Sequence, residues 1–257
     1  MGVSGAEGNG NGNLNTPVDA LLDQNGDYYK RSSAFSGIAD SKVGTLSMWF
    51  NPGTNGAITG DARFFNMGII GNTASREKID VSFSTISNKF DIRSRNGSGT
   101  LIMRMTNDTA VSRDAWHNLL FSFDLGAGTT QLYLDDAEDR SASPTTVDEA
   151  IVYTDAVENA LLNISNGGIT VDLPMCVSDF YFNSAEAIDL SVTANRRDFI
   201  DASGDRVDLG ADGSGPTGSQ PIICLNKARA NWNENVGSGG NFTLNGSVSD
   251  CASAPDA

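Results

Sequence analysis

Short runs in which apolar and polar residues alternate are the feature that most constrains the fold of this chain. Ile79, Val81 and Phe83 alternate with polar residues, and the next run repeats the pattern with Phe90 and Ile92. Because successive side chains of a β-strand point to opposite faces, a period of two predicts strands that bury one face. Such runs recur about every 10 to 15 residues, between Gly, Asn, Asp and Pro residues that favour turns. The sequence therefore predicts an all-β fold of many short strands.

The length of 257 residues fits one large β domain, because all-β sandwiches often reach about 200 to 250 residues. With 39% apolar residues, the chain can form a substantial core without disulfides. A two-sheet antiparallel sandwich over residues 17–257 is the architecture that fits these runs. Residues 1–16 contain the repeat GNGNGN, which has no side chains to bury, so we expect a flexible or docking arm there.

Helix signals are few in this sequence. Residues 191–201 follow a polar start with apolar residues near one side, which predicts one short helix. Residues 201–257 begin as a Gly/Asp-rich loop and then carry the apolar anchors Trp232, Phe242 and Leu244. We therefore expect this loop and tail to pack back onto the sandwich.

The charge of the chain excludes several classes of partner. Seventeen Lys and Arg against 32 Asp and Glu give a formal net charge of −15. Such a surface repels phosphate backbones and anionic lipids, so we expect no nucleic-acid binding. No apolar run approaches the roughly 18 residues that cross a bilayer, and the N-terminus lacks the basic start and apolar stretch of a secretory signal. We expect synthesis in a cytoplasm and no membrane insertion.

The cysteines are Cys176, Cys224 and Cys251, so at least one of them cannot pair within the chain. Their wide spacing has no CxxC or zinc-type pattern, and we expect no disulfide framework. The sequence leaves open whether any two of them pair.

The single histidine, His117, is the first residue to consider for catalysis, because serine and cysteine hydrolases usually need a histidine base. It follows Trp116 at the head of an apolar run, on the same predicted strand face as Leu119 and Phe121. This position favours a hydrogen-bonded structural histidine over a catalytic base or a pH-sensing residue. The sequence also has no strand with carboxylates at alternate positions, as glycosidases use. We therefore predict no catalytic residues and a protein that is not an enzyme.

Two loops carry clusters of carboxylates that could hold an ion. Ca2+ takes several oxygen ligands from carboxylates and backbone carbonyls. The two candidate sets are Asp205, Asp208 and Asp212 in one loop, and Asp135, Asp136 and Asp139 in the other. Neither has the ligand spacing of an EF-hand, so a solvated loop is the alternative in both cases. Ca2+ is the only cofactor that the sequence suggests, and the sequence does not choose between the loops.

Three stretches stand in an order that points to a fold family. They are GDYYKRSSAFSGIADSKVGTLSMWFNP, RDAWHNLLFSFDLGAGTTQLYLDD and VSDFYFN, within roughly residues 25–190. This order resembles the laminin-G-like, concanavalin-A-like jelly roll, in which two antiparallel sheets form the sandwich. The resemblance implies that TTQLYLDD is the hairpin partner of HNLLFSFD. It also implies glycan or protein recognition, with metal sites in some members of the family.

The C-terminal region is similar to the ending of laminin-G-like domains in tailed-bacteriophage particle proteins. The likeness lies in residues 195–226 and in the following NWNENVGSGGNFTLNGSV. It implies a virion structural protein, such as a capsid decoration, a head fibre or a tail-associated jelly roll, located on the virion surface. Its partners would be other virion proteins and host-surface glycans, and it would act as a homo-oligomer or in many copies on the particle.

The alternative hypothesis is an extracellular carbohydrate-binding module or adhesin of a bacterium. This hypothesis predicts glycan binding through loop aromatics and carboxylates, with Trp232 as a stacking platform. The other interpretation of Trp232 is a core anchor for the tail. A lyase or hydrolase on the same fold is a third hypothesis, for which the sequence offers no acid and base pair.

Overall fold

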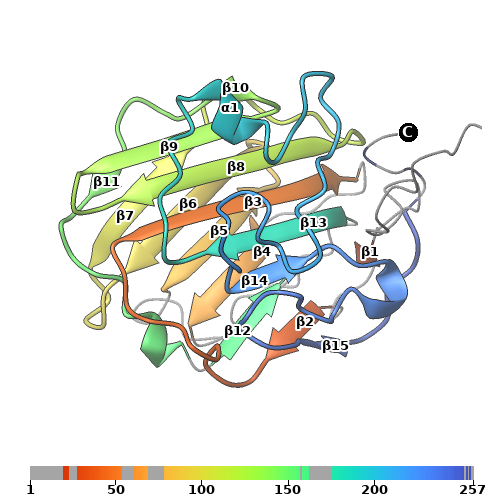
Figure 1. Ribbon diagram of the computed structural model, residues 1–257. Coiled ribbons are helices and arrows are strands. Elements are labelled where there is room, and N and C mark those ends of the chain that lie inside the picture. Colours follow the sequence, from red (N-terminus) through yellow and green to blue (C-terminus); the bar gives the residue numbers. More distant parts are fainter. Residues whose placement is uncertain are drawn as a thin grey trace, which may run out of the picture.

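The computed structural model describes residues 20–22, 28–53, 61–68, 78–156, 158–161, 175–251, 253 and 255. The described strands form two antiparallel sheets that lie face to face, with sheet A in front of sheet B in Figure 1. The chain is therefore an all-β, two-sheet antiparallel jelly-roll sandwich, as the alternation predicts. The arm expected at residues 1–16 lies outside the described residues.

Sheet A has seven strands, and every described pairing in it is antiparallel. Its order is β1 (Ala20–Leu22), β13 (Met175–Asn183), β3 (Val43–Pro52), β8 (His117–Asp124), β9 (Thr129–Leu134) and β10 (Ala137–Glu138), with β14 (Ile223–Leu225) on the edge of β13. The hairpin of β8 and β9, which the family resemblance implies, is confirmed.

Sheet B has eight strands, also antiparallel throughout the described pairings. Its order is β11 (Thr145–Thr146), β7 (Leu101–Thr106), β6 (Lys89–Arg95), β5 (Ile79–Ser84), β4 (Asp61–Gly68), β12 (Glu158–Leu161), β2 (Tyr28–Arg31) and β15 (Thr243–Asn245). Strand β15 comes from the C-terminal tail, so the tail completes this sheet.

The main core fills the space between the two sheets. Ile79, Val81 and Phe83 of β5 are fully buried there, and Phe90 and Ile92 of β6 continue the same layer. The polar residues between them face away from the core, because the side-chain direction alternates along a strand. The predicted alternation is therefore confirmed on both strands.

Phe50 of β3 connects the two sheets across this core. Its ring lies edge-on to Phe64 of β4 and Phe90 of β6, with centroid distances of 5.4 and 5.0 Å. Edge-to-face contacts of this kind stabilise a pair by about 0.5–1.5 kcal/mol beyond the burial of apolar area. Aromatic packing therefore fixes how the sheets sit on each other.

A second, smaller core covers the outer face of sheet A. Leu120 of β8, Tyr133 of β9 and Tyr181 of β13 point outward and pack against apolar residues of the segment that follows β13. That segment crosses in front of sheet A in Figure 1 and contains the helix α1 (Thr193–Arg196). The short helix predicted within residues 191–201 is thus confirmed as one turn. Two 3-10 turns, η1 (Tyr153–Asp155) and η2 (Arg229–Asn231), complete the described elements.

One disulfide fastens the C-terminal tail to sheet A. Cys176 of β13 and Cys251 are bonded, with their Cα atoms 6.0 Å apart, whereas Cys224 is free and buried. The sequence predicted no disulfide framework, and the structure has one disulfide in its described part. Spacing along the sequence does not report which cysteines the sheet brings together. Phe242 of the tail belongs to the main core, so this part of the tail packs on the sandwich.

Candidate functional site

The first candidate calcium loop is held by its own hydrogen bonds. Asp208 accepts the backbone N–H of Gly210 at 2.8 Å, and Asp212 accepts that of Ser214 at 3.0 Å. The Ser214 hydroxyl and N–H also hold the pKa of Asp212 below its ordinary value. Asx turns of this kind shape a loop without an ion, because the carboxylates already have donors.

The second candidate loop is the tight turn between β9 and β10. Asp135 and Asp136 have φ values of +50° and +65°, in the left-handed region that a two-residue hairpin turn of the primed type requires. Asp136 accepts hydrogen bonds from Arg196 and Arg197 at 2.5 and 2.6 Å, which ties α1 to this turn. The three carboxylates thus have separate partners, and Asp139 binds Thr109 through its backbone N–H and hydroxyl.

No three His, Cys, Asp or Glu side chains gather as a metal site within the described ranges of the chain. The carboxylates at 205, 208 and 212, and those at 135, 136 and 139, are therefore not brought together as ligand sets. Ca2+ binding stays a prediction.

Trp232 is a core residue and not a stacking platform. Its side chain is 0% exposed, and its ring centroid lies 5.0 Å from that of Tyr29 on β2. A sugar cannot stack on an indole that other side chains already cover on all sides. The interpretation of Trp232 as a glycan-binding residue is therefore wrong, and the tail-anchor interpretation is confirmed.

His117 lies in an array with the composition of a catalytic triad. Its Nδ1 is 2.6 Å from Oδ2 of Asp135, and its Nε2 is 3.0 Å from Oγ of Ser112. Asp135 is itself held by the backbone N–H of Asn118 at 2.8 Å. A triad uses these same contacts to let histidine accept the serine proton.

A further contact argues for a structural role of this array. Nε2 of His117 also lies 3.1 Å from the backbone carbonyl oxygen of Ser112, and a carbonyl can only accept a hydrogen bond. An N–H on Nε2 satisfies that contact, while a bare lone pair would face another lone pair. With Nδ1 2.6 Å from Asp135 and Nε2 against Ser112, the ring ties β8 to the preceding loop and to the β9–β10 turn. The geometry supports the predicted hydrogen-bonded structural histidine.

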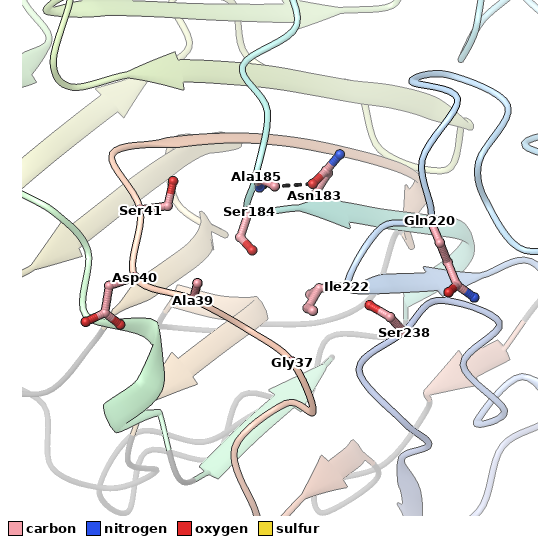
Figure 2. Close-up of a pocket in the computed structure, with 10 residues that line it drawn as sticks. All are labelled: Gly37, Ala39, Asp40, Ser41, Asn183, Ser184, Ala185, Gln220, Ile222 and Ser238. Carbon is pink, nitrogen blue, oxygen red and sulfur yellow. Dashed lines mark hydrogen bonds between the residues drawn. The ribbon is translucent and has the colours of Figure 1, made fainter.

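A pocket of about 350 Å3 opens at one edge of the sandwich (Figure 2). Its volume lies within the range of about 300–1,000 Å3 that is usual for small-molecule sites. Four parts of the chain supply the wall, namely the loop before β3, the end of β13 with the residues after it, the residues before β14, and the tail loop between η2 and β15. The lining residues are Gly37, Ala39, Asp40, Ser41, Asn183, Ser184, Ala185, Gln220, Ile222 and Ser238.

The hydroxyl groups of Ser184 and Ser238 point into this pocket from opposite sides, with Ile222 between them (Figure 2). Asp40 turns toward η1, where its Oδ1 accepts the backbone N–H and the hydroxyl of Thr154 at 3.0 and 2.8 Å. The groups that face the cavity are therefore mainly neutral donors and acceptors beside a small apolar surface.

A second polar feature crosses the outer face of sheet B, on the side away from the main core. Cross-strand pairing places one residue of each strand in a single row: Thr145, Arg104, Arg93, Asp80, Asn66, Ala160, Lys30 and Thr243. We call this set the arginine row. The alternation predicted that Asp80 and Arg93 point outward, but it could not predict that the register places them side by side.

Charged side chains of the arginine row are fixed by ion pairs. Asp80 is fully buried and contacts Arg93 at 2.9 Å, Asn66 at 3.3 Å and Arg63 at 3.4 Å. Arg104 donates Nε and Nη2 to the two oxygens of Asp91, at 3.0 and 2.9 Å. Arg104 remains half exposed, so the row runs from a buried end at Asp80 to an open end at Arg104.

In the described part of the structure, no helix is both long and apolar enough to cross a membrane. The sequence matches no known protein family and no curated protein.

The fold matches solved structures. The heptameric SAP-like pentraxin of Limulus polyphemus superposes with a TM-score of 0.53 at 9% identity, over 92% of this chain and 94% of that chain. A Bacteroides ovatus protein to which carbohydrate binding is provisionally assigned superposes with a TM-score of 0.61 at 9% identity. That match covers 94% of this chain and 62% of the other, so this chain spans less than two thirds of its length. At such identities, the likeness establishes the fold.

Proposed function

We propose that this protein is a non-catalytic carbohydrate-binding jelly roll, whose ligand occupies the pocket in Figure 2. The observation that carries the proposal is the lining of that pocket. Ser184 offers a hydroxyl that can donate and accept, Ser238 offers the lone pairs of a hydroxyl that donates to the Pro221 carbonyl at 3.2 Å, and Ile222 offers an apolar surface between them.

A neutral sugar fits this lining better than other small molecules do. Sugar hydroxyls need donors and acceptors in close alternation, and the C–H groups of the ring need an apolar contact. The Ser184 hydroxyl can rotate to serve as either partner, and Ser238 Oγ can accept. Asp40 is the one carboxylate in the lining, and Thr154 already donates two hydrogen bonds to it. The described wall contains no cation, so an anionic ligand has no charge partner there, and Asp40 is already engaged by Thr154.

The fold gives independent support to this proposal. The Bacteroides ovatus protein, to which carbohydrate binding is provisionally assigned, shares the fold over 94% of this chain. Of the two hypotheses from the sequence, the carbohydrate-binding module is therefore the one that we favour. A fold is used for many functions, so the pocket and its variants must decide the matter.

The test is to screen the protein on a glycan array and to measure the affinity for each hit by calorimetry. Ala39→Phe places a large ring in the pocket without removing a hydrogen bond, and it should abolish binding of a neutral glycan. Ser184→Ala should weaken binding about tenfold, if the hydroxyl makes one hydrogen bond that is left unsatisfied without it. Ser203→Ala, on an exposed loop, is the matched control and should bind like the wild type. Equal affinity of the Ala39→Phe variant would refute the proposal.

A place on a virus particle stays a prediction of the sequence alone. It requires the polypeptide to occur in purified particles, with other virion proteins as neighbours. Mass spectrometry of such particles is the direct test. Absence of the chain would leave the extracellular carbohydrate-binding module as the remaining hypothesis.

Calcium dependence is likewise a prediction that thermal unfolding can test. A ligand that binds only the folded protein raises the melting temperature, and the stabilisation grows with the logarithm of the ligand concentration over Kd. If either carboxylate loop binds Ca2+, then added CaCl2 should raise the melting temperature and a chelator should reverse the change. Equal melting temperatures in CaCl2 and in chelator would contradict the prediction that either loop binds Ca2+.

A further inference from the structure

Ser184 carries a hydroxyl that points into the pocket of Figure 2 and has no protein partner there. The residue follows β13 directly and is only 6% exposed, yet no described residue forms a hydrogen bond with its Oγ. A mostly buried polar group without a partner costs stability, so such groups are usually satisfied. The Ser184 hydroxyl is thus available to a ligand, and it can donate a hydrogen bond to an acceptor in the pocket.

Ser238 lies on the opposite side of the pocket and serves as an acceptor. Its hydroxyl donates to the Pro221 carbonyl oxygen at 3.2 Å, so its proton is used while its lone pairs stay available. Its backbone N–H donates to the same carbonyl oxygen at 2.8 Å, and the N–H of Gly239 donates to the carbonyl oxygen of Ile222 at 2.9 Å. These hydrogen bonds fix the acceptor beside Ile222.

Ile222 is fixed between the two serines by the backbone. Its N–H donates to the carbonyl oxygen of Phe182 on β13 at 3.1 Å. At the end of the same strand, Oδ1 of Asn183 accepts the backbone N–H of Ala185 at 3.0 Å, which closes a turn around Ser184. Because hydrogen bonds fix the backbone at the donor, the apolar residue and the acceptor, a ligand has little of this wall to order when it binds.

The apolar part of the pocket is small and lacks an aromatic ring. Ile222, Ala39 and Ala185 supply its apolar side chains, and no Trp, Tyr or Phe belongs to the described wall. The face of a sugar ring stacks best on a broad aromatic surface. A single isoleucine beside two alanines instead matches a group of the size of a methyl. The lining therefore favours a sugar that inserts a methyl group.

An acetamido group combines the three features that this wall complements. It is a planar secondary amide, so its carbonyl oxygen and its N–H point in opposite directions when the amide is trans. The carbonyl accepts one hydrogen bond, the N–H donates one, and the methyl group is apolar. The wall presents its donor and its acceptor from opposite sides, with the apolar Ile222 between them (Figure 2).

We propose that this pocket selects N-acetylated sugars, an inference that rests on the proposed carbohydrate-binding function. Ser184 donates to the acetamido oxygen, Ser238 Oγ accepts the acetamido N–H, and the methyl group lies on Ile222. The described wall has no cation, so a neutral N-acetylhexosamine fits it better than an N-acetylated sugar acid. The volume of about 350 Å3 is near the lower end of the usual range, which suits one sugar unit or a chain end.

The experiment compares matched pairs of methyl glycosides by calorimetry, namely N-acetylglucosamine with glucose and N-acetylgalactosamine with galactose. The N-acetylated member of at least one pair should bind about tenfold more tightly, which is the effect of about one hydrogen bond. The N-formyl analogue of that sugar should bind about fourfold more weakly, because it lacks the methyl group that contacts Ile222. Saturation-transfer NMR should give the strongest ligand signal at the acetyl methyl protons.

Ser184→Ala tests the contact with the acetamido oxygen. It should remove most of the preference for the N-acetylated member of the pair, because the carbonyl then has no donor. Ser203→Ala, on an exposed loop, is the matched control and should keep the full preference. Melting temperatures check that both variants fold.

Equal affinity for both members of each pair, or a full preference in Ser184→Ala, would overturn this inference and leave the proposed function in place. Fucose offers a methyl group without an amide, and N-acetyllysine offers an acetamido group without a sugar ring. Binding of either one as tightly as the N-acetylated sugar would also overturn the inference. Failure of every sugar to bind would overturn the proposed function itself, and this inference with it.

Discussion

The indole Nε1 of Trp116 donates to the backbone carbonyl oxygen of Ser253 at 3.1 Å and lies 3.2 Å from its hydroxyl, across 137 positions of sequence. Two residues earlier in the tail, Cys251 is bonded to Cys176 on β13. The tail is thus fixed to β13 by a covalent bond and to the start of β8 by hydrogen bonds. These contacts make the described part of the tail, as far as Ser253, part of the sandwich.

Cys251→Ser should lower the free energy of unfolding by about 2–4 kcal/mol, because the bond closes a loop of 75 positions that is otherwise free in the unfolded chain. Urea titration measures the change. The wild type in a reducing buffer serves as the control and should show a similar loss, while the reductant should leave the variant unaffected. A stable variant with unaltered unfolding would mean that the other tail contacts suffice.

Trp232→Ala should lower the free energy of unfolding by about 3–5 kcal/mol, since it leaves a cavity where a fully buried indole contacts Tyr29. Trp116→Phe keeps an aromatic ring at a partly exposed position and removes one donor, so its cost should be about 1 kcal/mol. Chemical unfolding of both variants gives the comparison. Similar costs for the two would contradict the burial difference.

His117→Gln should lower the stability by about 1 kcal/mol, because it removes the hydrogen bonds to Asp135 and Ser112 at one edge of the sandwich. Glycan binding should persist, since His117 is not in the pocket wall. The wild-type protein should show no labelling of Ser112 by a fluorophosphonate probe. Labelling that disappears in the glutamine variant would instead identify the array as a working triad.

Asp136→Asn should destabilise the protein at neutral pH by about 1 kcal/mol, because it breaks the ion pairs with Arg196 and Arg197. The hydrogen bond from Arg197 holds the pKa of Asp136 below its ordinary value of 3.8 in the folded protein. The carboxylate therefore contributes stability above about pH 4, and this contribution is lost as the pH falls through the lowered pKa.

Urea unfolding of wild type and Asp136→Asn between pH 7 and pH 3 tests this dependence. The difference between the two proteins should be largest at neutral pH and should shrink below pH 4. Gln131→Leu, which removes a partner of Asp189 near the same helix, is a control for general weakening of this region. A difference that stayed constant with pH would show that the ion pairs contribute nothing.

The alternation along each strand was sufficient to predict much of the fold. Ile79, Val81 and Phe83 must share one face of any strand, because a period of two is a property of the extended backbone itself. The same reasoning predicts the polar outer position of Asp80. The short helix after β13 could also be predicted, since its signal lies within neighbouring residues.

The sites depend on contacts between residues that are distant in sequence. The arginine row exists because the register aligns Arg93 with Asp80 on one side and with Arg104 on the other. A shift of one residue in either pairing would move these side chains to the opposite face. No local pattern in the sequence encodes that register.

For Trp232, too, the sequence alone could not predict which residues its side chain contacts. The sequence allowed it to be either a stacking surface or a core anchor, because both roles require only an aromatic residue in the tail. Its contact with Tyr29 excluded the first role. The sequence by itself determined the class of fold and the direction of each side chain along its strand, since both follow from local backbone geometry. Only the tertiary structure decided which residues meet, because burial, the disulfide and the binding surfaces arise from packing between distant strands.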